Sequence, residues 1–115
     1  MVLALVADLM FSSKIRAAAS VSGADVRFAR TADDAVSQAR ALRPSLILLD
    51  LNAAPLAPID TIARLKADAG SAGARIVGFV SHVQADVIQA ARAAGIDEVM
   101  ARSAFVARLQ ELLAP

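Results

Sequence analysis

Short apolar runs alternate along the chain with longer stretches in which apolar residues recur every three or four positions. The short runs have the length of buried strands, and the longer stretches have the periodicity of helices with one apolar face. Five strands are predicted at residues 2–7, 25–29, 46–50, 75–80 and 97–101. Five helices are predicted at residues 14–20, 32–42, 59–69, 84–94 and 104–113.

The strongest strand signal is the run Leu46–Leu49, which leads from Pro44 into a single carboxylate, Asp50. An unbroken apolar run of this length is typical of a strand covered on both faces, as in parallel sheets. Strands that alternate with helices predict right-handed crossovers. The expected fold is therefore α/β, a doubly wound five-stranded parallel sheet with five helices in a three-layer sandwich. Residues 1–115 form a single domain in this prediction.

Capping residues mark the ends of the predicted helices. The starts are assigned to Ser12 or Ser13, to Thr31 with Asp34 as in a capping box, and to Ser103. The ends are assigned to Gly23, Arg43-Pro44, Gly70 and Gly95. Helical spacing predicts that these residues face the sheet: Ala35, Val36, Ala39, Leu42, Ile62, Leu65, Ala69, Val87, Ile88, Ala91, Phe105, Val106, Leu109, Leu112 and Leu113.

Composition narrows the classes of function. With 57% hydrophobic and 20% charged residues the chain is not a disordered one. A net charge of +1 gives no electrostatic footprint for nucleic acid or an anionic membrane. The absence of cysteine excludes disulfides, thiolate metal sites and cysteine nucleophiles. No apolar run approaches the roughly 20 residues of a membrane span, and the N-terminal run lacks the basic start of a signal peptide. We expect a cytoplasmic location.

Polar side chains follow four of the predicted strands: Asp8, Asp50, Ser81 and Arg102. Ligand sites of open α/β sheets lie at the carboxyl ends of the strands, so these side chains should converge at one edge. Asp50 is the central candidate in this arrangement. The alternative interpretation is an aspartate that only starts a turn by bonding nearby backbone N–H groups.

Three stretches bring a known family into view. Residues 46–52, Leu-Ile-Leu-Leu-Asp-Leu-Asn, resemble the phosphoacceptor strand of the response regulator receiver family of two-component signalling. Residues 76–81, Ile-Val-Gly-Phe-Val-Ser, and residues 90–100, Ala-Ala-Arg-Ala-Ala-Gly-Ile-Asp-Glu-Val-Met, resemble the region from that family's fourth strand to its fifth. The resemblance extends over essentially the full chain.

The resemblance implies a set of roles for the converging residues. Asp50 stands at the position that accepts a phosphoryl group from a histidine kinase, with Mg²⁺ bound beside it. Ser81 matches the hydroxyl residue that bonds the phosphoryl oxygens in the active state, and Arg102 matches a lysine that contacts the same group. Phosphoryl transfer to a carboxylate needs such cations because charge on the transferring oxygens must be neutralised.

The chain departs from the family pattern around Asp50. Alignment through Phe11 places Val6 and Ala7 where the family has two acidic residues that help hold Mg²⁺, with Asp8 one position beyond. A shift of one residue can turn a side chain to the opposite face, so Asp8 is only a weak metal ligand alongside Asp50. Ser103 replaces the proline that usually follows the lysine, and Ala53-Ala54 replace the Met-Pro after the phosphoacceptor, with proline displaced to Pro55.

These departures favour a pseudo-receiver that has kept the fold and weakened or lost Mg²⁺-dependent phosphorylation. In this hypothesis Arg102 forms a bidentate pair with Asp50 and occupies the place of the metal. The alternative is a solvated Arg102 that makes no contact with Asp50. Ser81 has two open interpretations, a switch hydroxyl or the cap of the helix that follows it. His82, the only histidine, is interpreted as an exposed loop residue.

Three functions are weighed on this basis. The first is a stand-alone signalling module that acts through protein binding rather than as an enzyme, with a histidine kinase or a downstream signalling protein as its partner. A homodimer through the last two helices is a further expectation. The second is a working receiver phosphorylated at Asp50. The third is a small flavodoxin-like cofactor-binding domain or enzyme, which the absence of a glycine-rich phosphate loop disfavours.

Overall fold

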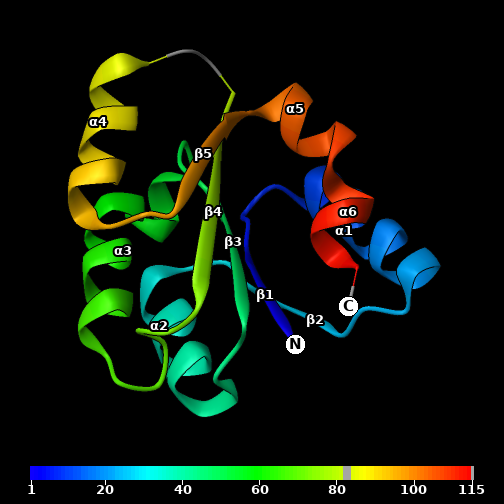
Figure 1. The fold of residues 1–115 in the computed structure, drawn as a ribbon, viewed down its shortest axis with the longest axis horizontal. Coiled ribbons are helices and arrows are strands. Elements are labelled where there is room, and N and C mark those ends of the chain that lie inside the picture. Colours follow the sequence, from blue (N-terminus) through cyan, green and yellow to red (C-terminus); the bar gives the residue numbers. More distant parts are fainter. Residues whose placement is uncertain (82–83, 115) are drawn as a thin grey trace.

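The computed structural model describes residues 1–81 and 84–114, and its centre is one parallel sheet (Figure 1). The strands are β1 (Val2–Leu5), β2 (Val26–Ala29), β3 (Leu46–Asp50), β4 (Arg75–Val80) and β5 (Glu98–Ala101). Their order across the sheet is β2-β1-β3-β4-β5, and every pair is parallel. The predicted doubly wound α/β fold is confirmed, and β3 lies in its middle.

Helices cover both faces of the sheet. They are α1 (Leu9–Ser22), α2 (Ala32–Leu42), α3 (Pro58–Ala67), α4 (Ala85–Ala94), α5 (Arg102–Ala107) and α6 (Leu109–Leu113), with a short 3₁₀ turn η1 (Ala54–Leu56) after β3. Figure 1 shows α2, α3 and α4 on one side and α1, α5 and α6 on the other. No helix in the described ranges has both the length and the apolar composition needed to cross a membrane.

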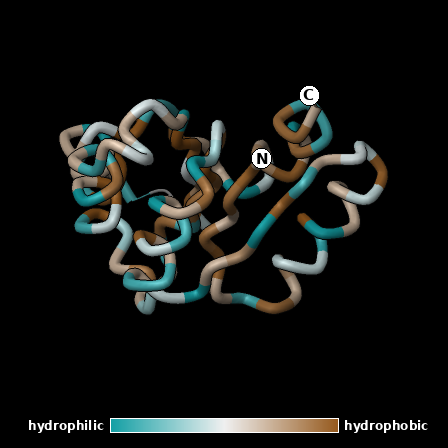
Figure 2. The backbone as a smooth tube through the Cα atoms, turned by 90° about the horizontal axis from the view of Figure 1, so that it is seen from below, coloured by the Kyte–Doolittle hydropathy of each residue, from teal (hydrophilic) through white to brown (hydrophobic). Residues whose placement is uncertain are grey.

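The core consists of two apolar layers separated by the sheet. Successive residues of β3 alternate between them, so Ile47 and Leu49 pack against the α2–α4 side while Leu46 and Leu48 pack against the α1–α6 side. All five residues of β3 are buried, as expected for a strand covered on both faces. In Figure 2 the hydrophobic colour is concentrated along the strands, and the helices alternate between hydrophobic and hydrophilic positions.

The first helix starts earlier than predicted. Asp8 is its N-cap and accepts bonds from the backbone N–H groups of Met10 and Phe11, so α1 begins at Leu9 rather than near Lys14. The predicted caps, Ser12 and Ser13, lie inside the helix and donate to backbone carbonyls four residues back. A carboxylate fills the capping role as well as a hydroxyl does, and it also suits the positive end of the helix dipole.

The last helical segment also differs from the prediction. Arg108 interrupts it, giving two short helices, and the N-cap of the first is Ala101, so Ser103 is a helical residue and not a cap. Val106 is 37% exposed instead of facing the sheet. Ala69 is likewise exposed, because α3 ends at Ala67. The caps predicted at Thr31, Gly23 and Gly95 are confirmed.

Three of the four phenylalanines of the chain form one buried stack on the α1–α6 side. The ring centroids of Phe79 on β4 and Phe105 on α5 are 4.4 Å apart, and Phe11 on α1 lies 4.7 Å from Phe79. These contacts join three elements that are far apart in the sequence. Such pairs add about 0.5–1.5 kcal/mol each beyond the apolar area that they bury.

Gly78 leaves room on β4 for side chains from two neighbouring segments. A methyl group added there would lie 2.7 Å from the Cδ1 of Ile96 and 3.0 Å from the Cδ1 of Leu51. We expect Gly78→Ala to lower the free energy of unfolding by about 1–3 kcal/mol through overpacking. Urea denaturation measures the change. Gly73→Ala is the matched control, because a methyl group there meets nothing within 4 Å, and an equal loss in both variants would contradict this account.

Candidate functional site

Asp50 ends the central strand at the carboxyl edge of the sheet, where the sequence predicts the site. Its side chain is nearly buried, with 9% of the residue exposed. One carboxylate oxygen, Oδ1, accepts the backbone N–H of Asn52 at 2.9 Å. Burial raises the pKa of Asp50, while the Asn52 bond and the charge of Arg102 oppose the rise. Burial therefore disfavours the ionised form of Asp50, and the Asn52 bond and Arg102 offset only part of this effect.

Asp8 lies at the same edge and makes two interactions, one with the start of α1 and one with Arg102. Its Oδ1 caps α1, accepting the N–H groups of Met10 at 2.9 Å and Phe11 at 3.4 Å. Its Oδ2 pairs with Nη2 of Arg102 at 3.5 Å. The backbone bonds, from Phe11 first and then Met10, lower the pKa of Asp8, and Arg102 adds to the effect. Asp8 reaches the site, but both of its oxygens are engaged.

Arg102 begins α5 and joins three features of this edge. Besides the pair with Asp8, its Nη1 donates to the Oγ of Ser81 at 3.5 Å. Its guanidinium carbon lies 4.2 Å above the centroid of the Phe11 ring, a cation–π distance. The predicted bidentate pair with Asp50 is wrong: among the described residues the carboxylate paired with Arg102 is that of Asp8. Asp8, which the sequence suggested as a weak metal ligand, is instead the carboxylate that pairs with Arg102.

Asn52 is the residue of this edge that the sequence analysis missed. Its Oδ1 accepts the backbone N–H of Ser81 at 2.7 Å, and its Nδ2 donates to Oε1 of Gln84 at 2.8 Å. Asn52 thus ties the loop after β3 to the end of β4 and to the start of α4. Its partners lie 29 and 32 positions along the chain, so no local pattern could have revealed them.

Ser81 is exposed and takes part in the site through Arg102 and Asn52. The alternative role as a helix cap is wrong, because the N-cap of α4 is Gln84, which makes no capping bond through its side chain. His82 lies outside the described residues. The carboxyl edge therefore brings together all four predicted residues, Asp8, Asp50, Ser81 and Arg102, with Asn52 added.

Comparisons with known proteins bear on this geometry. No protein-family model and no curated protein matches the chain. Solved structures do match: a response regulator of Hahella chejuensis has 18% identity and a TM-score of 0.87, over 97% of this chain and 90% of that one. A chemotaxis response regulator of Vibrio cholerae has 16% identity and a TM-score of 0.83, over 97% of both chains. The chain has the receiver fold.

A third similar structure comes from a longer protein. It is a response regulator of Burkholderia pseudomallei, crystallised with a phosphorylated aspartic acid, a calcium ion and citrate. Identity is 23% and the TM-score is 0.83, over 97% of this chain and 65% of that one. The chain thus spans about two thirds of that protein's length. The resemblance to receivers noted in the sequence is confirmed in the fold.

The residues present at this receiver edge do not fit a divalent metal well. Mg²⁺ prefers carboxylate oxygens and waters in octahedral geometry. Within the described ranges no three acidic or histidine side chains form a metal-binding group. Both oxygens of Asp8 are engaged by α1 and Arg102, which leaves the second oxygen of Asp50. The positions aligned with the acidic pair hold Val6, which is fully buried, and Ala7.

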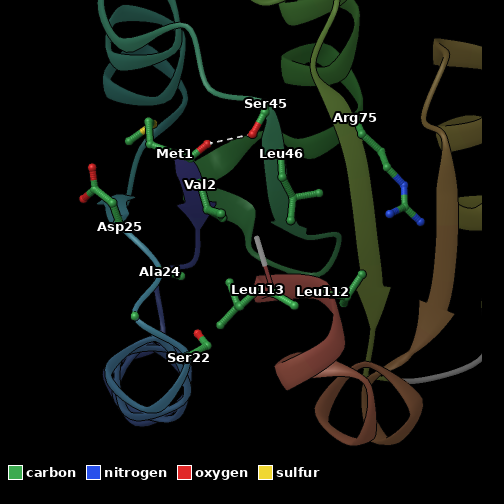
Figure 3. A pocket seen from close by; sticks show the side chains of 12 residues that line it. Met1, Val2, Ser22, Ala24, Asp25, Ser45, Leu46, Arg75, Leu112 and Leu113 are labelled. Atoms are coloured by element: carbon green, nitrogen blue, oxygen red, sulfur yellow. Dashed lines mark hydrogen bonds between the residues drawn. The ribbon is translucent and has the colours of Figure 1, made fainter.

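The opposite, amino edge of the sheet carries a separate cavity of about 400 Å³. Figure 3 shows Leu112 and Leu113 beside Val2 and Leu46, with Arg75 directed away from them. Arg75 is paired with Glu98 at 2.7 Å. The cavity has a mixed polar and apolar lining and lies at the far end of the strands from Asp50, so it is no part of the candidate site.

The raised pKa of Asp50 has a consequence for stability. A carboxyl group whose pKa is higher in the folded state contributes most below its ordinary value, and this contribution is lost as the pH rises through the folded pKa. We therefore expect Asp50→Asn to raise the midpoint of thermal unfolding near pH 7. The gain should vanish at about pH 4 and below, where Asp50 is protonated. Asp60→Asn, at an exposed carboxylate, is the control and should change little.

The cap at Asp8 is tested by a graded pair of substitutions. Asp8→Asn keeps a capping oxygen but removes the charge that Arg102 binds, whereas Asp8→Ala removes both. Thermal unfolding at neutral pH should rank the natural protein above Asp8→Asn, and Asp8→Ala lowest. Since the pKa of Asp8 is lowered, its contribution is present above the ordinary value and fades as the pH falls through the folded pKa. Equal stability of the three proteins would refute the double role.

Proposed function

We propose that the chain is a receiver-fold signalling module that acts through protein binding, with Mg²⁺-dependent phosphorylation at Asp50 weakened or lost. The partner is a histidine kinase or a downstream signalling protein in this proposal. The module is not an enzyme in its own right. Similarity to solved response regulators supports the module, and the arrangement around Asp50 supports the loss of phosphorylation.

The observation that carries the proposal is the engagement of Asp8. A metal beside Asp50 needs oxygens that are free to bind it, and Asp8 is a second carboxylate at this edge, whose charge acts on Asp50. Releasing Asp8 would cost the N-terminal cap of α1 and leave Arg102 without its carboxylate. The larger cost is the loss of the cap, because a part-exposed ion pair such as that with Arg102 contributes little to stability. In this proposal the engagement of Asp8 disfavours Mg²⁺ beside Asp50.

The charge of Arg102 also supports weakened phosphorylation at Asp50. A cation that moves freely could accompany a phosphoryl group and neutralise its oxygens in transfer. The guanidinium of Arg102 instead contacts Asp8 and the Phe11 ring. Its positive charge is therefore already partly neutralised by the carboxylate of Asp8. Asp50 alone is a weak nucleophile toward phosphorus without a cation on the oxygens of the transferring group. This arrangement favours an Asp50 that occupies the phosphoacceptor position without being phosphorylated.

A working phospho-receiver is the second candidate, and one observation favours it. Arg102 places a cation within reach of the Ser81 hydroxyl, and both groups could bind phosphoryl oxygens on Asp50. The response regulator of Burkholderia pseudomallei carries a phosphorylated aspartic acid together with a calcium ion. In this alternative Arg102 would leave Asp8 when a phosphoryl group is present, and Asp8 would turn to the metal.

Incubation with acetyl phosphate and Mg²⁺ separates the two candidates. Intact-mass spectrometry should show no adduct, or only a trace, in the natural protein. A substantial adduct of one phosphoryl group that disappears in Asp50→Asn would refute the proposed loss of phosphorylation. A receiver that is readily phosphorylated under the same conditions serves as the positive control for the reagent.

A second variant tests whether Arg102 is the cause. Arg102→Lys replaces the forked guanidinium with a single ammonium, which binds a carboxylate as a point charge and not in a fixed plane. If the hold on Asp8 limits the reaction, this variant should give more adduct than the natural protein in Mg²⁺ and no gain in EDTA. An unchanged yield would assign the loss to Val6 and Ala7 instead.

A further inference from the structure

The edge strand β2 carries backbone hydrogen-bonding groups that face away from the rest of the sheet. β2 is the outermost strand on its side, and β1 is its neighbour. The N–H of Val2 donates to the carbonyl of Asp25, so the alternation of the ladder turns the odd-numbered residues of β2 toward β1. The even-numbered residues, Val26 and Phe28, therefore direct their N–H and C=O groups beyond the edge of the sheet.

Two of the outward groups along this edge are satisfied within the chain. Gln38 on α2 donates through Nε2 to the carbonyl of Phe28 at 3.0 Å. The N–H of Ala24, two residues before Val26, donates to the carbonyl of Ala19 in α1 at 3.1 Å. Among the described residues, the outward groups from 24 to 28 that have no partner are both groups of Val26, the N–H of Phe28 and the carbonyl of Ala24.

A second copy of the chain, turned antiparallel about Val26, matches these groups one to one. A hydrogen-bonded pair in an antiparallel ladder exchanges two N–H···O bonds, and Val26 has both groups available for its symmetry mate. Two residues along, the N–H of Phe28 would meet the carbonyl of Ala24 in the other copy. The remaining groups at that position, the carbonyl of Phe28 and the N–H of Ala24, are the two that are already bonded within each chain. No outward backbone group from 24 to 28 would then lack a partner.

The charged side chains along β2 are complementary in the same arrangement. Asp25 lies one residue before Val26 and Arg27 one residue after it, so each would stand directly opposite the other across the two-fold axis. Both side chains are exposed, and within one chain Oδ1 of Asp25 lies 3.4 Å from Nε of Arg27. Opposite charges directly across two antiparallel strands stabilise their pairing. A second copy would therefore give each of these residues a further partner of opposite charge.

A hollow beside β2 offers room for an aromatic side chain of the other copy. It has a volume of about 540 Å³, and its lining includes Ala19 on α1 together with Ala24 and Val26. Phe28 is half-buried on the same side of the sheet, with the guanidinium carbon of Arg16 lying 4.5 Å from its ring centroid. In the antiparallel register Ala24 faces Phe28 of the second copy, so a small side chain meets a large one at both ends of the pairing.

We infer that the chain forms a symmetric dimer through β2, in which the two five-stranded sheets join into one. The two strands are antiparallel, and the two-fold axis passes between the two Val26 residues. This association goes beyond the proposed function, because it uses no residue of the candidate site and does not depend on phosphorylation of Asp50. It places the second copy on β2 and not on the last two helices, which the sequence suggested for a homodimer.

A second copy fits this edge better than an unrelated strand does. An unrelated antiparallel strand would present an N–H to the carbonyl of Phe28 and a carbonyl to the N–H of Ala24, and both of these groups are already bonded. Charged side chains commonly protect an edge strand from association. Centred on Val26 they attract instead, because Asp25 lies opposite Arg27 and neither lies opposite itself.

Sedimentation equilibrium over a range of concentrations tests the association. β2 has four residues, so the interface is small and we expect a weak dimer whose fraction rises with concentration. Asp25→Arg and Arg27→Glu should each weaken the dimer about tenfold or more, since either change places like charges opposite each other. The double variant should dimerise as the natural protein does, and so should an equal mixture of the two single variants. Asp60→Arg, at an exposed carboxylate on α3, is the control and should leave the dimer unchanged.

Val26→Pro tests the backbone pairing at the axis. Proline removes an N–H that faces away from β1, so the ladder within the chain stays intact while the two bonds at the axis are lost. A folded variant, checked by circular dichroism, should be monomeric. In the natural protein, exchange of the amide hydrogens of Val26 and Phe28 should slow as the concentration rises. The amide of Arg27, which faces β1, should show no such change.

Three results would each overturn the inference. One is a natural protein that stays monomeric at every soluble concentration. Another is a dimer that is as strong in both single charge-reversal variants as in the natural protein. The third is growth beyond the dimer, which would indicate head-to-tail pairing of β2 with the other edge strand, β5. If Val26→Pro does not fold, the charge-reversal variants decide, because Asp25 and Arg27 are exposed and their replacement leaves the monomer folded.

Discussion

The contact between Asp8 and Arg102 links the beginning and the end of the chain at the edge of the sheet. Asp8 precedes the first helix and Arg102 starts the fifth, 94 positions later. The carboxylate closes the N-terminus of α1, and the guanidinium covers the ring of Phe11 in the same helix. The two side chains thereby connect the loop after β1 to the junction of β5 and α5. What Asp50 can do depends on this contact, since it determines which charges remain for it.

The fold was largely predictable because the physical signals are strong and local. Four apolar residues in a row before Asp50 indicate a strand that is buried on both faces. Because strands alternate with helices along the chain, right-handed crossovers then predict a parallel sheet. The errors lie at helix ends. Asp8, Ser12 and Ser13 are all residue types that cap helices well. Which of them is the N-cap depends on the residue at which β1 ends and the backbone turns into the helix. The break at Arg108 depends on tertiary packing, which no periodicity records.

The site was predictable in its membership and less so in its contacts. Strand ends at a common edge placed Asp8, Asp50, Ser81 and Arg102 together. The partner of Arg102 was not predictable, because two carboxylates, Asp8 and Asp50, feel its charge and their positions relative to it are set by the folded backbone. Asn52 was missed for a similar reason, since an amide side chain acquires its role only from the backbone that faces it. Side-chain pairing at an edge is a three-dimensional property that residue type alone leaves open.

The phenylalanine stack beneath Arg102 gives the protein an optical property. The chain has no tryptophan and no tyrosine, and three of its four phenylalanines, Phe11, Phe79 and Phe105, are in contact with one another. Its near-ultraviolet circular dichroism must therefore come from phenylalanine bands, mostly from this one cluster. Because the Phe11 ring also carries the guanidinium of Arg102, that spectrum reports on the candidate site without any label.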